Sequence, residues 1–406
     1  MRVLPVSGNF GPAAASCSHN LGFANLAGMP DADETGITPF GQGRGVVAKF
    51  HPQPLLPMKI PQSRIPHLFT FSLLLCAGAL FGHAEVNYQL LKEIPVGGDG
   101  GWDYLSVDSA GHRLYVSHAS KVVVIDTLKD EVAGEIADTP GVHGFVCAPE
   151  LGRGFSSNGR ENKASIVDLK TLQTLSKVDT GENPDAILYE PGRQEVYTFN
   201  GRGKSATVFE AATGKVVATI PLGGKPEFAQ ADPAAGRVYV NIEDKNEVVA
   251  LDTKTHQIVN HWPIAPGEEA SGMDIDLAHH RLILGCSNEK MIIMDNTNGK
   301  VVASIDAGKG IDAAAFDAGN QLAFVSAGGS GTVTIAHEDA PDKFIVAQTL
   351  ATERSARTMT LDPATHRIYL VSAKFEAPAT PPPAGGSRPR PKMIPGTLKV
   401  LVYGTK

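Results

Sequence analysis

The feature that most limits the possible folds of this chain is a pattern that recurs seven times between residues 102 and 373. Each copy has an apolar stretch that ends at a mostly acidic position, a short polar turn, and a stretch rich in β-branched and aromatic residues. Successive copies are 40, 42, 42, 44, 41 and 45 residues apart. The aligned position is held by Asp108, Ala148, Glu190, Asp232, Asp276, Asp317 and Asp362. A period of about 40 to 45 residues is typical of β-propeller blades.

Each copy divides into four predicted strands. In the fourth copy the first strand ends at Asp232, and the linker "DPAAGR" forms a turn in which Asp accepts hydrogen bonds and Pro fixes φ. "RVYVN" is then the second strand and "EVVALDT" the third, and turns such as "TGK" lead to a fourth strand such as "KVVATIPLGG". Both faces of these strands are apolar, as expected where sheets pack face to face.

The two ends of the repeat array complement each other. The last copy ends in "LKVLVYGTK", a third strand with no fourth, while "YQLLKEIPVGGDG" from Tyr88 aligns with the fourth strand "GKVVATIPLGGKP" from Gly214. We expect the N-terminal strand to complete the last blade, which would remove an open sheet edge. The predicted fold is therefore all-β: a seven-bladed β-propeller of four-stranded blades over residues 85–406.

A candidate leader precedes the repeats, at residues 58–84. Lys59 and Arg64 are followed by a 14-residue apolar run, Leu68–Phe81, and then by small residues ahead of Glu85. The run is short for a membrane-spanning helix but fits a secretory signal peptide cleaved near Ala84. The alternatives are an uncleaved anchor and lipoprotein processing. Residues 1–57 show no apolar periodicity, and we interpret them as a disordered or spurious N-terminal extension.

Charge and cysteine content limit the partners of the exported part. Residues 85–406 hold 31 Lys and Arg against 40 Asp and Glu, a net charge of −9. Such a chain lacks the clustered cations that bind nucleic-acid phosphates, so no nucleic-acid partner is expected. Cys147 and Cys286 are its two cysteines, which allows one disulfide at most. We expect a periplasmic or secreted monomer without a transmembrane segment in the mature chain.

Several repeat motifs indicate a family. "RLYVS" (Arg113–Ser117), "RVYVN" (Arg237–Asn241) and "VVVIDT" (Val122–Thr127) resemble the YVTN-repeat, YncE-like seven-bladed propellers of bacterial envelopes and surfaces. The resemblance covers residues 88–406, with Glu195 and Gln321 in place of the repeat Arg in blades 3 and 6. It implies an architecture rather than an activity, because this fold serves both enzymes and binding scaffolds.

Seven equivalent positions, five residues before the aligned Asp, are expected to surround the mouth of the central channel. They are Asp103, His143, Asp185, Glu227, Ser271, Asp312 and Arg357, with Glu268 and Glu269 next to the uncharged Ser271. The charged members are candidate ligand-binding residues. A divalent cation bound by oxygen ligands is possible there, and no other cofactor is expected. The alternative is a solvated funnel whose charges pair with one another.

The loops between the second and third strands should form an outer ring on the same face. "SNGREN" and "NGRGK" place Asn158, Arg160, Asn200 and Arg202 on neighbouring loops, where two guanidiniums could clamp an anionic group. The alternative is that Asn-Gly simply forms the turn and Arg is solvated. The equivalent loop of blade 7 is a Pro-rich, basic insertion, residues 375–395, which either docks a partner or is disordered.

The sequence lacks the motifs of better-defined activities. It has no Cys-x-x-Cys-His for c-type haem, and no H-E-x-x-H, G-x-S-x-G or P-loop. We therefore favour an exported binding or scaffold protein, whose funnel face recognises an unknown protein, small molecule or envelope polymer without catalysis. A metal-assisted hydrolase or lactonase that uses the mouth carboxylates is one alternative. A non-catalytic subunit of an envelope redox complex is the other.

Overall fold

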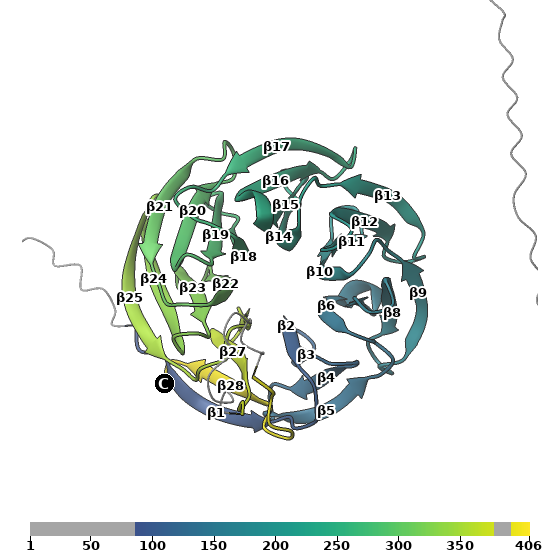
Figure 1. Ribbon diagram of the computed structural model, residues 1–406, viewed down its shortest axis with the longest axis horizontal. Helices are drawn as coiled ribbons and strands as arrows, with labels where there is room; N and C mark the ends of the chain where they lie inside the picture. Colours follow the sequence, from purple (N-terminus) through teal and green to yellow (C-terminus); the bar gives the residue numbers. More distant parts are fainter. Residues whose placement is uncertain (1–85, 377–390) are drawn as a thin grey trace, which may run out of the picture. The chain divides into compact units, whose positions relative to one another are not determined.

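The computed structural model describes residues 86–376 and 391–406, which form a ring of seven four-stranded antiparallel sheets (Figure 1). Each blade runs from an inner strand at the channel to an outer strand at the rim. The all-β seven-bladed propeller predicted from the repeats is thus confirmed. The blades are: blade 1, β2 (Trp102–Asp108), β3 (Arg113–His118), β4 (Lys121–Asp126), β5 (Glu131–Ile136); blade 2, β6 (Val142–Ala148), β7 (Arg153–Asn158), β8 (Lys163–Asp168), β9 (Thr174–Asp179); blade 3, β10 (Pro184–Glu190), β11 (Glu195–Asn200), β12 (Ser205–Glu210), β13 (Val216–Pro221); blade 4, β14 (Pro226–Asp232), β15 (Arg237–Ile242), β16 (Glu247–Asp252), β17 (Gln257–Pro263); blade 5, β18 (Ala270–Asp276), β19 (Arg281–Cys286), β20 (Lys290–Asp295), β21 (Val301–Asp306); blade 6, β22 (Ile311–Asp317), β23 (Leu322–Ala327), β24 (Thr332–Ala340), β25 (Lys343–Ala351); and blade 7, β26 (Met359–Asp362), β27 (Arg367–Ser372), β28 (Lys399–Gly404), β1 (Gln89–Pro95).

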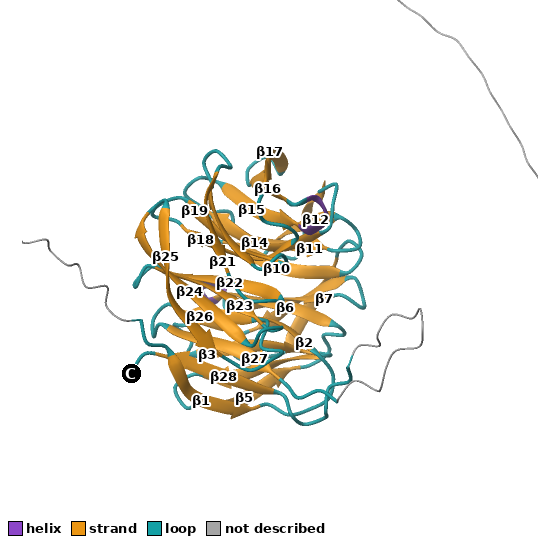
Figure 2. Cartoon of the chain, turned by 60° about the vertical axis from the view of Figure 1, so that its left-hand side comes forward, coloured by secondary structure: helices purple, strands orange, loops and turns teal. Residues whose placement is uncertain are grey.

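Strands account for nearly all the regular structure of the described residues, as Figure 2 shows. Two short 3-10 helices, η1 (Pro149–Leu151) and η2 (Glu243–Lys245), interrupt loops of blades 2 and 4. No helix in residues 86–376 and 391–406 is long and apolar enough to cross a bilayer. The predicted extension at 1–57 and leader at 58–84 lie outside the described residues, as does most of the Pro-rich insertion.

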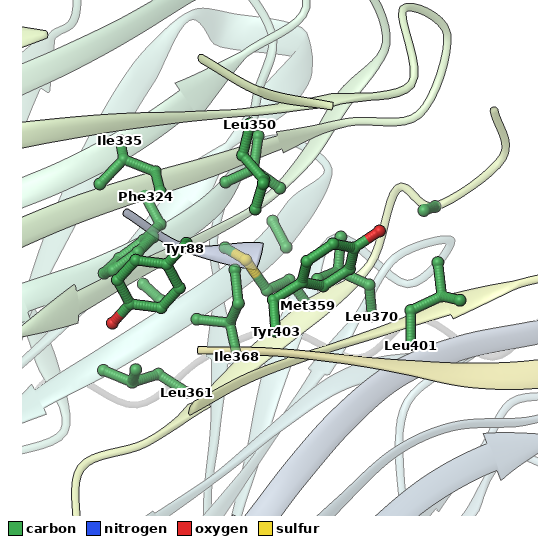
Figure 3. Close-up of a cluster of buried hydrophobic side chains, with 14 of the residues drawn as sticks. Tyr88, Phe324, Ile335, Leu350, Met359, Leu361, Ile368, Leu370, Leu401 and Tyr403 are labelled. Atoms are coloured by element: carbon green, nitrogen blue, oxygen red, sulfur yellow. The ribbon is translucent and has the colours of Figure 1, made fainter. Parts of the chain in front are cut away.

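The N-terminal strand closes the ring, as predicted. β1 pairs antiparallel with β28, from Gln89 opposite Gly404 to Pro95 opposite Lys399. Tyr88 anchors the junction: its ring meets Phe324 edge-to-face at 5.4 Å (Figure 3). Its hydroxyl donates to the carbonyl of His366 at 2.7 Å. The closed ring leaves no blade without its outer strand, which removes the free edge expected of an open array.

The hydrophobic core lies between neighbouring blades. Figure 3 shows one such layer, in which Phe324 and Ile335 of blade 6 pack against Ile368, Leu370 and other side chains of blade 7. The second and third strands are therefore buried on both faces, as in β3 and β4, whereas outer strands such as β5 and β17 are largely exposed. Cys147 and Cys286 lie in blades 2 and 5 as unpaired thiols, so the disulfide that the sequence allowed does not form.

The turns after the first strands share one feature in all seven blades, a residue with positive φ just before the second strand. The first strand ends at the aligned position, and in six blades its carboxylate accepts backbone N–H groups of the turn, as when Asp232 accepts from Ala235 at 2.9 Å. In blade 2 the position is Ala148, and the 3-10 helix η1 forms the turn. The residue before the second strand has positive φ in every blade. These residues are His112, Gly152, Gln194, Gly236, His280, Gln321 and His366. Gln321 thus lies in the turn, so its assignment to the repeat Arg position of blade 6 was wrong. Leu322 holds that position, opposite Asp317.

Candidate functional site

A bulge in the first strand directs the predicted mouth residues into the channel. In blades 1 to 6 the register between first and second strands shifts near the second residue of the first strand, as between Trp102 and Leu105. A bulge adds one residue and turns its side chain away from the regular alternation. The bulge residues include Asp103, His143, Asp185, Glu227, Ser271 and Asp312, and Arg357 precedes β26 in blade 7. The loops between second and third strands lie on this face, since Gly159 and Gly201 donate to the carbonyls of Gly141 and Asn183.

At the channel mouth, the imidazole of blade 2 lies between a carboxylate of blade 1 and one of blade 3. His143 Nδ1 lies 2.6 Å from Asp103 Oδ2 and 3.5 Å from Asp185 Oδ1. All three side chains are mostly buried, and their ligand atoms lie within 4.8 Å of one another. One nitrogen and two oxygens at this spacing form a donor set that could hold a divalent cation.

A guanidinium closes the other side of this group. Arg357 forms an ion pair with Asp312, and its second terminal nitrogen lies 3.8 Å from Asp103 Oδ1 and donates to the carbonyl of Trp102 at 3.2 Å. Arg357 is therefore fixed across the junction of blades 6, 7 and 1. The structure brings together the charges that the sequence placed at equivalent points of the ring.

Glu227 lies in a second group on the mouth of blade 4. Its carboxylate accepts a hydrogen bond from the Tyr104 hydroxyl at 3.1 Å and pairs with Lys225 Nζ at 2.5 Å. Lys225 also pairs with Glu243, the first residue of η2. The Tyr104 ring packs edge-to-face on Phe228 at 5.2 Å, which links blade 1 to blade 4 across the channel.

Burial and crowded carboxylates shift the protonation of the mouth. Burial raises the pKa of Asp185 to about 6, in spite of the adjacent His143, and burial with the nearby Asp185 raises that of Glu227 to about 8. Burial opposes the charged form of His143, but its hydrogen bond to Asp103 and the charges of Asp185 and Glu227 raise its pKa to about 8. Burial also raises the pKa of Asp312, although Arg357 counteracts it. At neutral pH His143 and Glu227 are therefore mostly protonated.

Asp274, deeper in the propeller, was not among the predicted residues. Its carboxylate accepts from Gln230 Nε2 at 2.9 Å and from the backbone N–H groups of Ile275 and Phe316 at 2.8 and 2.6 Å, which joins the first strands of blades 4, 5 and 6. Burial raises its pKa to about 7. The repeat alignment already sets this residue apart. Two residues before the aligned position, the seven copies read Ser106, Val146, Leu188, Gln230, Asp274, Ala315 and Thr360, so Asp274 is their one acidic residue.

The outer-ring residues separate into two kinds. Asn158 and Asn200 are fully buried, and their amides donate to Ser165 at 2.8 Å and to Thr207 at 3.1 Å within their own blades. These two side chains are therefore part of the turn, the alternative kept from the sequence, and cannot reach a ligand. Arg160 and Arg202 are exposed on the mouth face.

Blade 5 contributes little charge to the mouth. Glu268 and Glu269 are exposed, and the carboxylate of Glu269 accepts from the Ser287 hydroxyl at 2.9 Å. Ser271 itself is partly buried. Blade 5 is thus the one blade whose residue at the mouth position carries no charge.

Comparison with known proteins supports the fold. No known protein family matches the chain in sequence, and no curated protein does. Among many solved chains of similar structure is one titled Kuenenia stuttgartiensis hydrazine synthase, with a TM-score of 0.59 and 15% sequence identity. The match covers 67% of this chain and 92% of that chain. At this identity the likeness shows a shared fold alone, so the chain is assigned to the β-propellers by architecture and to no sequence family.

Proposed function

We propose that this chain is an exported binding or scaffold protein that recognises a positively charged group at its channel mouth. The observation that carries the proposal is that carboxylates outnumber cationic side chains at the mouth. The five carboxylates are Asp103, Asp185, Glu227, Glu243 and Asp312, and the three cations among them are His143, Lys225 and Arg357. Negative charges gathered on low-dielectric walls attract cations into a cleft.

The raised pKa values of Asp185 and Glu227 also reflect the excess of carboxylates at the mouth. Both carboxyl groups keep their protons longer than usual because burial and neighbouring carboxylates disfavour the charged forms. An amine or guanidinium would supply positive charge and displace a proton. The ligand class is therefore a small molecule with such a group, or a basic segment of an envelope protein. Export rests on the leader at 58–84, and the resemblance to YVTN-repeat propellers supports a role at the cell envelope.

Thermal-shift measurements on the full chain with amines and guanidines test this proposal. We expect at least one cation to raise the melting temperature, and calorimetry in buffers of different ionisation enthalpy should show proton release near pH 7 on binding. Asp185→Asn with Glu227→Gln should abolish both effects. Glu135→Gln, an exposed ion-pair change on β5, is the matched control. If no cation binds, or if anions bind better, the proposal is wrong.

A second candidate is a metal-assisted hydrolase or lactonase, favoured by the Asp103–His143–Asp185 group. In this case the three side chains would hold a divalent cation, which lowers the pKa of a bound water. Glu227, with its pKa near 8 and its hydrogen bond to Tyr104, would be protonated at neutral pH and could act as a general acid.

The two candidates are distinguished by a chelator. Binding of an amine in the presence of EDTA supports the first. Hydrolysis of esters or lactones that needs added Mn²⁺ or Zn²⁺, and that is lost in His143→Gln, supports the second. If added Mn²⁺ or Zn²⁺ gives no turnover of any ester or lactone, the hydrolase hypothesis is wrong.

A further inference from the structure

A second group of possible metal ligands lies at the opposite end of the first strand from the mouth. Asp276 is the last residue of β18, and His279 follows in the turn before β19. Glu338 is contributed by β24 of blade 6. The group therefore bridges two blades, and it shares no residue with the channel mouth.

The three side chains are in direct contact. His279 Nδ1 lies 2.7 Å from Asp276 Oδ2 and 3.1 Å from Glu338 Oε1. The Asp276 and Glu338 side chains are 2% and 1% exposed, while His279 is 35% exposed and opens the group to solvent. Their ligand atoms all lie within 4.8 Å of one another.

Glu338 differs from its counterparts in the other blades. In each of blades 1 to 6, a backbone N–H at or just beyond the end of the third strand donates to the carbonyl of the turn residue before the second strand. The residues that carry this N–H in blades 1 to 6 are Thr127, Leu169, Ala211, Thr253, Asn296 and Glu338. Five of the six are neutral. In blade 6 a carboxylate is buried at a place where the fold needs none.

The Glu338 carboxylate also lacks the donors that a buried charge requires. Neither oxygen accepts a hydrogen bond within the described residues, and His279 at ion-pair distance is its one cationic neighbour there. The His366–Asp317 pair between blades 6 and 7 is different. Asp317 accepts from His366 at 2.8 Å and from Gly319 and Asn320 as well. Two buried carboxylates that share one imidazole must hold a proton between them or gain a cation, because uncompensated buried negative charge is costly.

We propose that Asp276, His279 and Glu338 bind a divalent transition-metal cation that links blades 5 and 6. A donor set of one imidazole nitrogen and two carboxylate oxygens suits Zn²⁺ or Mn²⁺ better than Ca²⁺ or Mg²⁺, which prefer oxygen alone. Metal bonds of about 2.0–2.2 Å place neighbouring ligand atoms about 3–3.5 Å apart, close to the spacing of this group. The exposed side of His279 provides an entry path and an open coordination position.

The probe is Zn²⁺ alone, added to the full chain after chelator treatment. We expect one equivalent to bind at this group, with a rise in melting temperature and X-ray absorption that shows nitrogen and oxygen neighbours without sulfur. Glu338→Thr should lose that equivalent, or weaken it at least 100-fold, and Thr occupies the same position in blades 1 and 4. His279→Ala, at a half-buried position, should do the same if the Thr variant does not fold.

Two further variants separate zinc held by this group from zinc held elsewhere on the propeller. Asp185→Asn removes a mouth ligand and should leave this equivalent bound, whatever the mouth itself takes up. His366→Ala breaks the His–carboxylate pair without a third ligand and should also leave it bound. Unchanged zinc binding in both Glu338→Thr and His279→Ala would overturn the proposal. So would an absence of zinc binding in the parent chain, which would mean that Asp276 and Glu338 merely share a proton.

Discussion

Replacing Glu227 by Gln should remove a loss of stability that its buried carboxyl causes as the pH rises. The folded chain raises the pKa of this group from 4.5 to about 8, first through burial and then through the charge of Asp185. Between these two values the folded state keeps a proton that the unfolded state loses. The folded state therefore binds more protons, and the free energy of unfolding falls as the pH rises through this window.

The magnitude follows from the shift. One pKa unit corresponds to about 1.4 kcal/mol, so a shift from 4.5 to about 8 sets a ceiling of about 5 kcal/mol. Glu227 titrates together with Asp185 and lies 2.5 Å from Lys225, whose pairing Gln weakens. We therefore expect about 2–3 kcal/mol in practice. Gln can still accept the hydrogen bond from Tyr104, and Lys225 keeps Glu243 as a partner.

The assay is urea unfolding of the full chain at pH 5, 7 and 9, followed by the fluorescence of Trp102 and Trp262. The two proteins should be similar at pH 5, where Glu227 is protonated, and the Gln variant should be about 2–3 kcal/mol more stable at pH 9. Glu135→Gln is the control, because its exposed ion pair with Lys121 should contribute less than about 1 kcal/mol at any pH. A difference between Glu227→Gln and the parent that is the same at pH 5 and pH 9 would refute the reasoning.

Three further predictions concern closure, a turn and export. Tyr88→Ala should cost about 3–4 kcal/mol in the same urea assay, because Tyr88 is buried against Phe324 at the junction that closes the ring, whereas Tyr88→Phe should cost about 1 kcal/mol. Gly299→Ala should lower the melting temperature, because Gly299 has φ +75° and a Cβ there would lie 2.1 Å from the Trp262 ring; no change would contradict this. Mass spectrometry of the exported protein should find its N-terminus at or near Glu85, and an intact leader would contradict cleavage.

Much of the fold could be predicted because its determinants are local and repeated. An Asp or Glu ends six of the seven first strands where its side chain can accept from the turn, so copies of one sequence pattern give copies of one geometry. The closing strand was found because a missing fourth strand and an extra one stood at opposite ends. The assignment of Gln321 to the Arg position was wrong by one residue. The turn has the same positive φ in every blade, so the five-residue spacing from Asp232 to Arg237 also holds from Asp317 to Leu322, and Leu322 takes the Arg position.

The site could be predicted only in outline. Equal spacing from the aligned Asp placed Asp103, His143 and Asp185 on one ring, but their ion pairs depend on the bulges and on side-chain conformations that spacing does not fix. The pKa shifts depend on burial across blades, which is a property of the closed ring. Asn158 and Asn200 were counted as ligand-binding candidates, although Asn before Gly in a turn commonly turns inward to satisfy its own loop.

The repeat itself gives a way to separate structural from functional charge, because seven blades offer several versions of each position. Asp274 and Glu338 are both acidic at positions where other blades hold neutral residues, so neither carboxylate is needed to build a blade. Asp274 accepts three hydrogen bonds, from Gln230 and two backbone groups, and these compensate its burial from within the fold. Glu338 has no such donors among the described residues. Of the two, Glu338 is therefore the carboxylate for which we propose a metal cation as a partner, beside His279 at 3.1 Å.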